Sequence, residues 1–136
     1  MDNAQIKKIL LETKTIAVVG LSANEEKDSY WVCQYIQEQG YRIIPVNPRT
    51  PEILGEKAYA SLLDISEKVD MVLLFRPSAD VPPFIPQAIR IGAKVVWMQT
   101  GIANRAAERE ARAAGLQVVM DTCIRVAHQF LIGARG

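Results

Sequence analysis

The sequence has few cysteines and histidines and no long apolar run. Its 136 residues include two cysteines, Cys33 and Cys123, and one histidine, His128. The cysteines are far apart and fit no metal-ligand spacing, and one histidine cannot build a His-rich cluster, so no metal site is expected, although carboxylates alone could still bind a hard cation. This cysteine usage predicts a reducing, cytoplasmic location. No apolar run approaches the roughly 20 residues of a membrane-spanning helix, so no membrane partner is expected.

An excess of charge of one sign is also missing. The chain carries 16 basic and 15 acidic residues, for a formal net charge of +1. Without a basic excess, or aromatics interleaved with Lys and Arg, no nucleic-acid partner is expected. An anionic ligand must therefore be held by local positive groups. Segment 1–12 mixes apolar and charged residues at helical spacing and predicts an amphipathic helix rather than a secretory signal.

Short β-branched runs alternate with longer stretches of helical period along the chain. Five runs are strand-like and nearly continuously apolar: 15–19, 41–46, 70–75, 94–98 and 116–120. Continuous apolarity indicates strands buried on both faces, as in a parallel sheet covered by helices. The predicted fold class is α/β, a Rossmann-like doubly wound, five-stranded parallel sheet with helices on both faces. No repeat or flexible linker divides the chain, so a single domain over residues 1–136 is expected.

The segments between the strands predict the covering helices. Helical spacing of apolar residues, or a run of strong helix formers, marks 29–39, an irregular helix entered near 81, 103–114 and 122–131. Gly40, Gly92 and Gly115 follow three of these helices, where a left-handed cap is expected. A short helix is expected at 59–63.

The residues that follow the five strands are mostly small, hydroxylic, amide or cationic. In an open parallel sheet, ligands bind outside the carboxyl ends of the strands, near the point where strand order reverses. We therefore predict a cofactor-binding groove lined by Ser29 and by these strand-end residues: Gly20, Leu21, Ser22, Asn47, Pro48, Arg49, Arg76, Pro77, Ser78, Gln99, Thr100, Gly101, Asp121, Thr122 and Cys123.

Gly20 is the candidate phosphate contact after the first strand. A glycine there lets backbone amides approach a phosphate, and the helix beginning near Ser29 offers its positive dipole end. Ser22 and Ser29 are the candidate side-chain contacts. The loop lacks the further glycines of the G-x-G-x-x-G fingerprint, and a plain turn explains Gly20 equally well. Three acidic residues in this loop repel a pyrophosphate unless they point outward: Glu25, Glu26 and Asp28.

Arg49 is the most informative residue after the second strand. NAD-binding folds place an acid there for the ribose hydroxyls, but here stand Asn47, Pro48 and Arg49. An arginine suits a phosphate on the adenosine ribose, which NADP and coenzyme A both carry. The alternative is a solvated charge or an ion pair with Glu52.

The other strand ends offer further contacts. Arg76 emerges from an apolar strand and can reach a pyrophosphate, or pair with Asp80 or Asp121. At Thr100 and Gly101 the backbone can approach a ligand closely, although a helix cap explains this pair as well.

Cys123 is placed at the start of the terminal helix, a position that favours a reactive thiolate. A buried structural cysteine is the alternative. His128 follows it by five positions, which does not bring both side chains to one helix face, so a Cys/His catalytic pair is not expected. Cys33 lies on an amphipathic helix and is assigned to the core.

Taken together, five segments resemble the small stand-alone CoA-binding domain proteins: 16–22, 45–48, 75–77, 99–102 and 121–123. That family is similar in turn to the N-terminal CoA-binding domain of the succinyl-CoA ligase alpha subunit. The resemblance implies a Rossmann-like fold that holds coenzyme A with its strand-end loops. By position, it implies phosphates near 20–22, the adenosine end near 47–49, the rest of the groove at 76–78 and 99–101, and the pantetheine arm near 121–123.

Three functional hypotheses follow. The first is a non-catalytic module that binds coenzyme A or an acyl-CoA. The second is an NADP- or nucleotide-binding enzyme, or a protein in which Cys123 exchanges disulfides with the cofactor thiol or attacks an acyl thioester. The third is a sensor of coenzyme A that signals to a protein partner or to its own copy in a homodimer.

Overall fold

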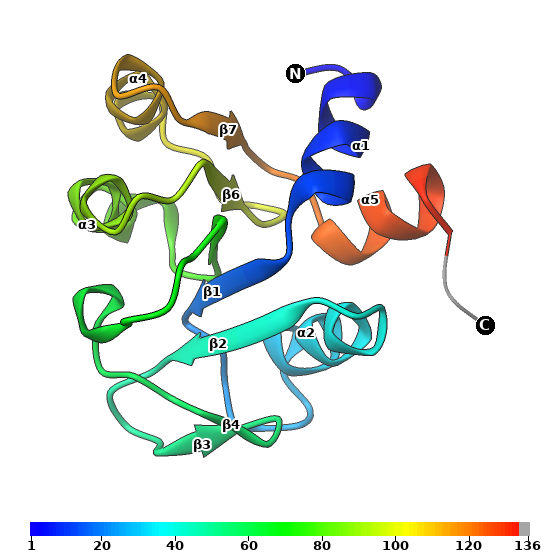
Figure 1. The fold of residues 1–136 in the computed structure, drawn as a ribbon, viewed down its shortest axis with the longest axis vertical. Helices are drawn as coiled ribbons and strands as arrows, with labels where there is room; N and C mark the ends of the chain where they lie inside the picture. The colour runs from blue at the N-terminus through cyan, green and yellow to red at the C-terminus, as the bar shows by residue number, and fades with distance from the viewer. Residues whose placement is uncertain (134–136) are drawn as a thin grey trace.

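A five-stranded parallel sheet forms the centre of the molecule, as expected. The computed structural model describes residues 1–133. The sheet has the order β2-β1-β5-β6-β7, and all its neighbours pair in parallel. Figure 1 shows this sheet with its five strands: β1 (Thr15–Val19), β2 (Arg42–Val46), β5 (Met71–Leu74), β6 (Val95–Met98) and β7 (Gln117–Val119).

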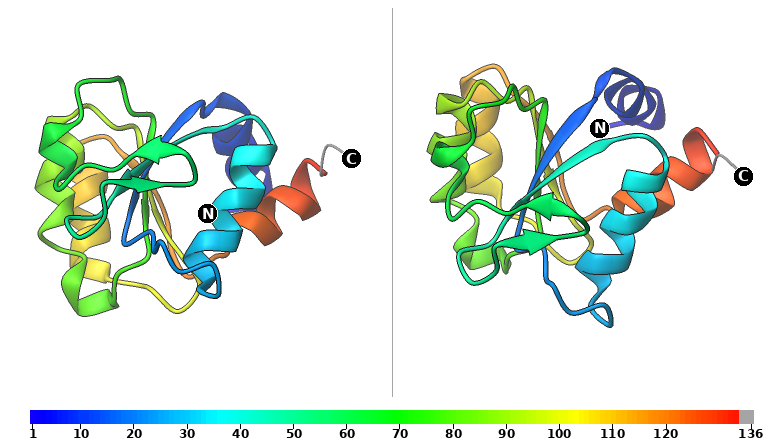
Figure 2. Two further views of the ribbon diagram at one scale, coloured as in Figure 1. Left: turned by 90° about the horizontal axis from the view of Figure 1, so that it is seen from below. Right: turned by 60° about the horizontal axis from the view of Figure 1, so that its bottom comes forward.

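Helices cover both faces of the sheet (Figure 2). One face carries α3 (Phe84–Arg90) and α4 (Arg105–Ala113), whose buried residues share a core cluster with Ala17 and Val19 of β1. The other face carries α1 (Asn3–Glu12), α2 (Asp28–Glu38) and α5 (Ile124–Leu131). Ile16 and Val18 pack in this second cluster. The alternation along β1 explains why its run is continuously apolar, because both faces are buried.

Local sequence signals account for most helix ends. Asp2 and Gln5 form a capping box at the start of α1, and the Asn104 side chain caps α4. Gly40 follows α2 with a φ of 99°, in the left-handed conformation expected there. At its other end α2 begins at Asp28, with Lys27 at the cap position and no side-chain cap.

The segment between β2 and β5 differs from the prediction. The expected helix at 59–63 is absent: Tyr59 forms a β-bridge with Val46, and a 3-10 turn spans Leu62–Asp64. The backbone of Tyr59 pairs with Pro45 and Asn47 instead of with its own helix turn. Before it lies an unpredicted hairpin of β3 (Glu52–Ile53) and β4 (Glu56–Lys57). Strands of two residues are too short to show a periodic pattern.

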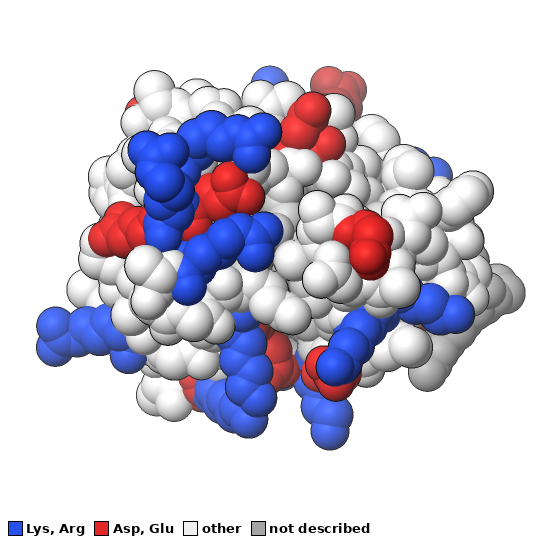
Figure 3. All heavy atoms as spheres, turned by 90° about the horizontal axis from the view of Figure 1, so that it is seen from above, with Lys and Arg blue, Asp and Glu red and all other residues white. Residues whose placement is uncertain are grey.

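The surface over α4 carries charges of both signs. Glu108 is within 3.1 Å of Arg105 and 3.3 Å of Arg112, so acidic and basic groups alternate along the helix. Figure 3 shows Lys and Arg interspersed with Asp and Glu on this face. Acidic and basic side chains therefore lie close together on this face. Within residues 1–133, none of the helices has the length and apolarity to span a bilayer.

Candidate cofactor-binding site

The strand order reverses between β1 and β5. The chain leaves β1 for β2 on one side and returns to β5 on the other, so the loops after these strands diverge and leave a crevice. Gly20 lies in this crevice with a φ of 87°. A Cβ atom there would lie 3.2 Å from the Phe75 carbonyl oxygen and 3.3 Å from Arg76 Cδ. Glycine therefore keeps the crevice open and is strongly preferred by the backbone conformation.

A cavity of about 640 Å³ opens at this point. Its volume lies within the usual range of small-molecule sites. The loops after β1, β2 and β5 supply most of its lining, and all these loops leave the same edge of the sheet. The lining residues are Val19, Gly20, Leu21, Ser22, Ala23, Asn24, Val46, Asn47, Pro48, Arg49, Thr50, Ala60, Arg76 and Phe84.

The first wall is the loop from β1 to α2. The Ser22 amide donates to Ser29 Oγ at 3.0 Å, and Ser22 Oγ accepts from the Asn24 amide at 3.0 Å. Ser29 is buried, so it braces this loop from below. A smaller hollow of about 320 Å³, lined in part by Gly20, Ser22 and Ser29, continues from the cavity to the start of α2. The positive end of that helix therefore faces the phosphate position predicted from the sequence.

The second wall is the loop after β2. Asn47 is half-buried and its carboxamide bonds to both walls, whereas Pro48 and Arg49 are exposed. No ion pair of the Arg49 guanidinium exists among residues 1–133, and the alternative pairing with Glu52 is not formed. Arg76, by contrast, pairs with Asp80 at 3.0 Å. Of the two guanidinium groups that line the cavity, Arg49 has no ion pair in residues 1–133, and Arg76 keeps further N–H donors beside its one contact to Asp80.

Other predicted contacts hold neighbouring loops instead of lining this cavity. Buried Gln99 accepts from the Ile124 amide at 3.1 Å, and Asp121 accepts from the Gly101 amide at 2.6 Å. Ser78 Oγ accepts from the Ala103 amide at 3.0 Å. Thr122 Oγ donates to the Met120 carbonyl, and Pro77 is exposed. The hydrogen bonds of these polar side chains therefore go to backbone groups and fix the loops.

Cys123 lies at the same edge of the sheet but in a different hollow. It is half-buried at the cap position of α5 and lines a space of about 420 Å³ with Thr100, Asp121 and Thr122. His128 does not share this space, and its Nδ1 lies 2.8 Å from the Tyr35 hydroxyl. Cys123 and His128 therefore line different hollows, and His128 has Tyr35 as a neighbour. Cys33 is fully buried, as assigned, and burial raises the pKa of its thiol far above the ordinary range.

Several lining residues were not predicted from the sequence. Phe84 and Ala60 come from the segments after β5 and β4, far from any strand-end motif. Phe84 falls in the irregular helix expected from near residue 81, and it packs partly against the core. Asn24 and Thr50 lie just beyond the motif segments and could have been found by extending them two residues.

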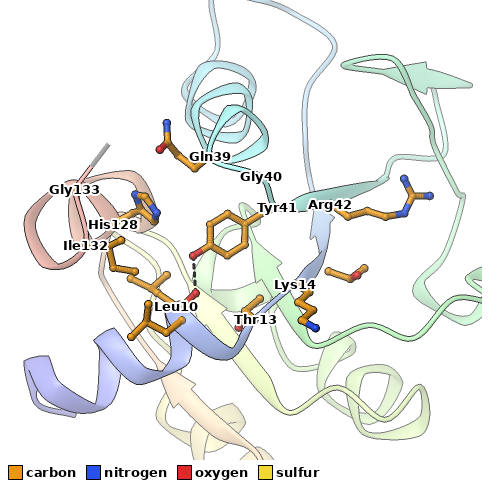
Figure 4. A pocket seen from close by; sticks show the side chains of 12 residues that line it. Leu10, Thr13, Lys14, Gln39, Gly40, Tyr41, Arg42, His128, Ile132 and Gly133 are labelled. Atoms are coloured by element: carbon orange, nitrogen blue, oxygen red, sulfur yellow. Dashed lines mark hydrogen bonds between the residues drawn. The ribbon is translucent and has the colours of Figure 1, made fainter. Parts of the chain in front are cut away.

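A second hollow of about 460 Å³ lies at the opposite, amino edge of the sheet (Figure 4). Tyr41 reaches from the start of β2 toward α1 and donates to the Leu10 carbonyl, beside His128 of α5. Arg42 is held by Glu56 and Glu67. Tyr41 and Arg42 are therefore engaged within the protein, while Lys14 lines the hollow as an exposed cation.

Comparison with known proteins finds relatives that match nearly the whole chain. The uncharacterized protein YneT of Bacillus subtilis is 43% identical over 125 residues, which is 92% of this chain and 93% of that protein. The structure of a hypothetical protein from Pyrococcus horikoshii superposes with a TM-score of 0.94 and 41% identity, over 98% of this chain and 94% of that one. The whole length of the domain is therefore matched at high similarity.

An enzyme subunit is also similar, over a small part of its length. The alpha subunit of the ADP-forming acetate–CoA ligase II of Pyrococcus furiosus is 30% identical over 122 residues, which is 82% of this chain but 27% of the subunit. The family model of the CoA binding domain matches residues 14–129, from just before β1 to near the end of α5. The chain therefore belongs to the CoA binding domain family.

Proposed function

We propose that this chain binds coenzyme A or an acyl-CoA in the carboxyl-edge cavity without transforming it. The observation that carries the proposal is the lining of that cavity: Gly20 at the reversal of strand order, and an exposed Arg49 with no ion pair in the described chain. A bisphosphorylated adenosine needs close backbone approach at its pyrophosphate and a cation at its ribose phosphate. The loop after β1 supplies the close backbone approach at Gly20, and the loop after β2 supplies the cation, Arg49.

The chain's own groups have distinct roles in this proposal. The start of α2 takes the pyrophosphate, because its first-turn amides and the helix dipole favour negative charge there. Gly20 lets the phosphate approach closely, although the Gly20 and Ser22 amides themselves donate to the Val46 carbonyl and to Ser29 Oγ. Arg49 takes the phosphate on the adenosine ribose through charge-assisted hydrogen bonds. Glu25 and Glu26 are exposed and line neither this cavity nor the hollow at the start of α2, so the solvent screens their repulsion of the cofactor. Asp28 does line the hollow at the start of α2, together with Lys27, whose opposite charge offsets it.

The binding role without catalysis is supported by the chemistry of the lining. Apart from the two arginines, the cavity is lined by apolar residues, small residues, serine, threonine and asparagine. General acids and bases are usually His, Asp, Glu, Lys, Tyr or Cys, and none of these lines it. In residues 1–133 there is also no group of three His, Cys, Asp or Glu that could hold a metal ion.

Calorimetry with three ligands tests the proposal. We expect binding of coenzyme A, about tenfold weaker binding of dephospho-CoA, and weaker binding of NADP, whose phosphate sits on a different ribose hydroxyl. Arg49→Ala should weaken coenzyme A binding about tenfold, as expected for a charge-assisted contact. Arg109→Ala, an exposed cation on α4, is the matched control and should leave affinity unchanged.

Two results would count against the proposal. Absence of heat with coenzyme A would remove it, and tighter binding of NADP would favour the nucleotide-enzyme hypothesis instead. Small molecules released on denaturing the purified protein would identify the natural occupant.

We further propose that the sensor form of this function uses α5 for contact with a partner. Val126 and Phe130 lie one helical turn apart on α5 and are 57% and 80% exposed. Sedimentation with and without coenzyme A tests this form, because a sensor must change its association when the cofactor binds. An unchanged sedimentation coefficient would exclude the sensor and favour a module that only binds the cofactor.

A further inference from the structure

We propose that Asn47 is a positioning residue that aims Arg49, and that the cavity's preference for a ribose phosphate depends on it. The inference rests on the proposed function, because the preference is defined by coenzyme A binding. The sequence predicts that Asn47 contacts the ligand directly. In the structure one N–H and the oxygen of its carboxamide are bonded within the chain, to Leu21 and to Arg49. These bonds fix the side chain and connect it to Arg49, through which we infer its effect on a ligand.

The backbone of Asn47 is fixed before its side chain acts. Its amide donates to the Tyr59 carbonyl at 2.8 Å, and the Tyr59 amide donates to the Pro45 carbonyl at 2.9 Å. Tyr59 thus extends the sheet by a β-bridge to Val46, next to Asn47. Asn47 therefore leaves the sheet in a direction set by backbone hydrogen bonds.

The carboxamide then joins the two walls of the cavity. Its Nδ2 donates to the Leu21 carbonyl at 3.0 Å, and its Oδ1 accepts from the Arg49 amide at 2.8 Å. Leu21 is fully buried, so its carbonyl oxygen depends on an internal partner. A neutral amide carries both a donor and an acceptor, whereas a carboxylate carries acceptors alone. Asparagine suits both bonds at this position.

Arg49 depends on this arrangement more than Arg76 does. The Arg76 guanidinium is oriented by Asp80, at 3.0 Å, whereas Arg49 has no such partner in residues 1–133. The bond from the Arg49 amide to Asn47 closes a tight side-chain turn over residues 47–49. Loss of that turn frees the backbone that carries the guanidinium, so Arg49 loses its fixed position at the cavity.

The test is the ratio of the dissociation constants of dephospho-CoA and coenzyme A, measured by calorimetry. The two ligands differ in the ribose phosphate alone, so the ratio reports on the contact to that phosphate. For the unaltered chain we expect a ratio of about ten, and for Asn47→Ala a ratio below about three. Combining Asn47→Ala with Arg49→Ala should lower the ratio no further than Arg49→Ala does, because both act on one contact.

Asn104 provides a matched control. Its carboxamide makes the same pair of bonds at another loop: Nδ2 donates to the Ser78 carbonyl at 3.0 Å, and Oδ1 accepts from the Ala107 amide at 3.0 Å. Asn104 does not line the cavity. Asn104→Ala should lower the melting temperature about as much as Asn47→Ala but leave the ratio near ten. If Asn47 had a structural role alone, both alanine variants would have a lower melting temperature, and the ratio of dissociation constants would stay near ten in each.

Asn47→Asp separates the two bonds and is informative even if the alanine variant does not fold. The carboxylate keeps the acceptor for Arg49 but loses the donor to Leu21. We expect both ligands to bind more weakly by a similar factor while the ratio stays near ten. A collapsed ratio in Asn47→Asp, or an unchanged one in Asn47→Ala, would overturn the inference. Failure of the unaltered chain to bind either ligand would instead overturn the proposed function, together with this inference.

Discussion

The two edges of the sheet carry hollows of similar size but use their polar groups differently. At the amino edge, Tyr41 bonds to the Leu10 carbonyl, His128 to Tyr35, and Arg42 to two glutamates. At the carboxyl edge, asparagine and serine side chains hold the loops, and Arg49 is left without an ion pair in the described chain. Both edges therefore bond most of their polar side chains within the protein, and each keeps an exposed cation without an ion pair in residues 1–133, Lys14 at one edge and Arg49 at the other. The carboxyl edge differs in having Gly20 at the reversal of strand order.

The difference follows from what each edge must do. The amino edge joins α1 and α5 to the sheet, and Tyr35 and Tyr41 pack edge-on against the buried His128 ring. Those contacts stabilise the fold. The carboxyl edge is where strand order reverses, so its loops separate and leave room for a ligand. The comparison predicts that substitutions at the amino edge lower stability, and that substitutions at the carboxyl edge lower binding.

Gly20→Val is expected to have the largest effect and to change both properties. The backbone at Gly20 has a φ of 87°, and a Cβ would meet Phe75 and Arg76 in the crevice. Conformational strain and crowding together should cost about 4 kcal/mol of unfolding free energy. Coenzyme A affinity should fall by about 100-fold or more, because the side chain occupies the phosphate position. Urea unfolding and calorimetry measure the two effects.

Gly92→Val separates strain from crowding. Gly92 has a φ of 79°, and a Cβ there meets nothing within 4 Å. We expect a loss of about 2 kcal/mol, from strain alone, with unchanged affinity. If the Gly20 variant bound coenzyme A as tightly as the Gly92 variant, the crevice would not be the phosphate site.

His128→Ala should have the next largest effect, confined to stability. The ring is 4% exposed and contacts Tyr35 and Tyr41, so its removal leaves a cavity and a Tyr35 hydroxyl without that partner. We expect a loss of about 3 kcal/mol in urea unfolding. Coenzyme A affinity should stay within about twofold. A large loss of affinity in a variant that is still folded would break the distinction between the two edges.

The sequence predicts the sheet better than the site. Each central strand lies within its predicted run, because burial on both faces leaves a continuous apolar signal such as 15–19. Gly20 and Arg49 were found because strand ends in parallel sheets share one edge. The bond from Asn47 to Leu21 joins residues 26 apart, and no local pattern encodes it. Likewise, Gln99 accepts from the Ile124 amide at the start of α5, and the sequence around Gln99 contains no signal for this bond.

Asp70→Ala tests the amino edge with a smaller expected effect. The Asp70 carboxylate accepts from the Lys14 and Thr15 amides, each at 3.0 Å, and so ties the start of β1 to β5. Loss of both bonds should cost about 2 kcal/mol of unfolding free energy, without a change in affinity. Asp70→Asn keeps an acceptor at this position and should recover part of the loss. Equal losses in both variants would show that the charge matters rather than the acceptor.

Arg42→Ala should have the smallest effect, and one that depends on pH. Arg42 hydrogen-bonds Glu67 and lowers the pKa of that carboxyl, but both side chains are more than a third exposed. After solvent screening we expect a loss of about 0.5 kcal/mol at pH 7. Because the pKa of Glu67 is lowered in the folded chain, this stabilisation is present above the carboxyl's ordinary pKa and disappears as pH falls through the folded value. The two proteins should therefore differ in urea unfolding at pH 7 and converge in acid, once Glu67 is protonated in the folded chain, with the same coenzyme A affinity at pH 7. A difference that persists in acid would assign the effect of Arg42 to the packing of its side-chain methylenes rather than to its charge.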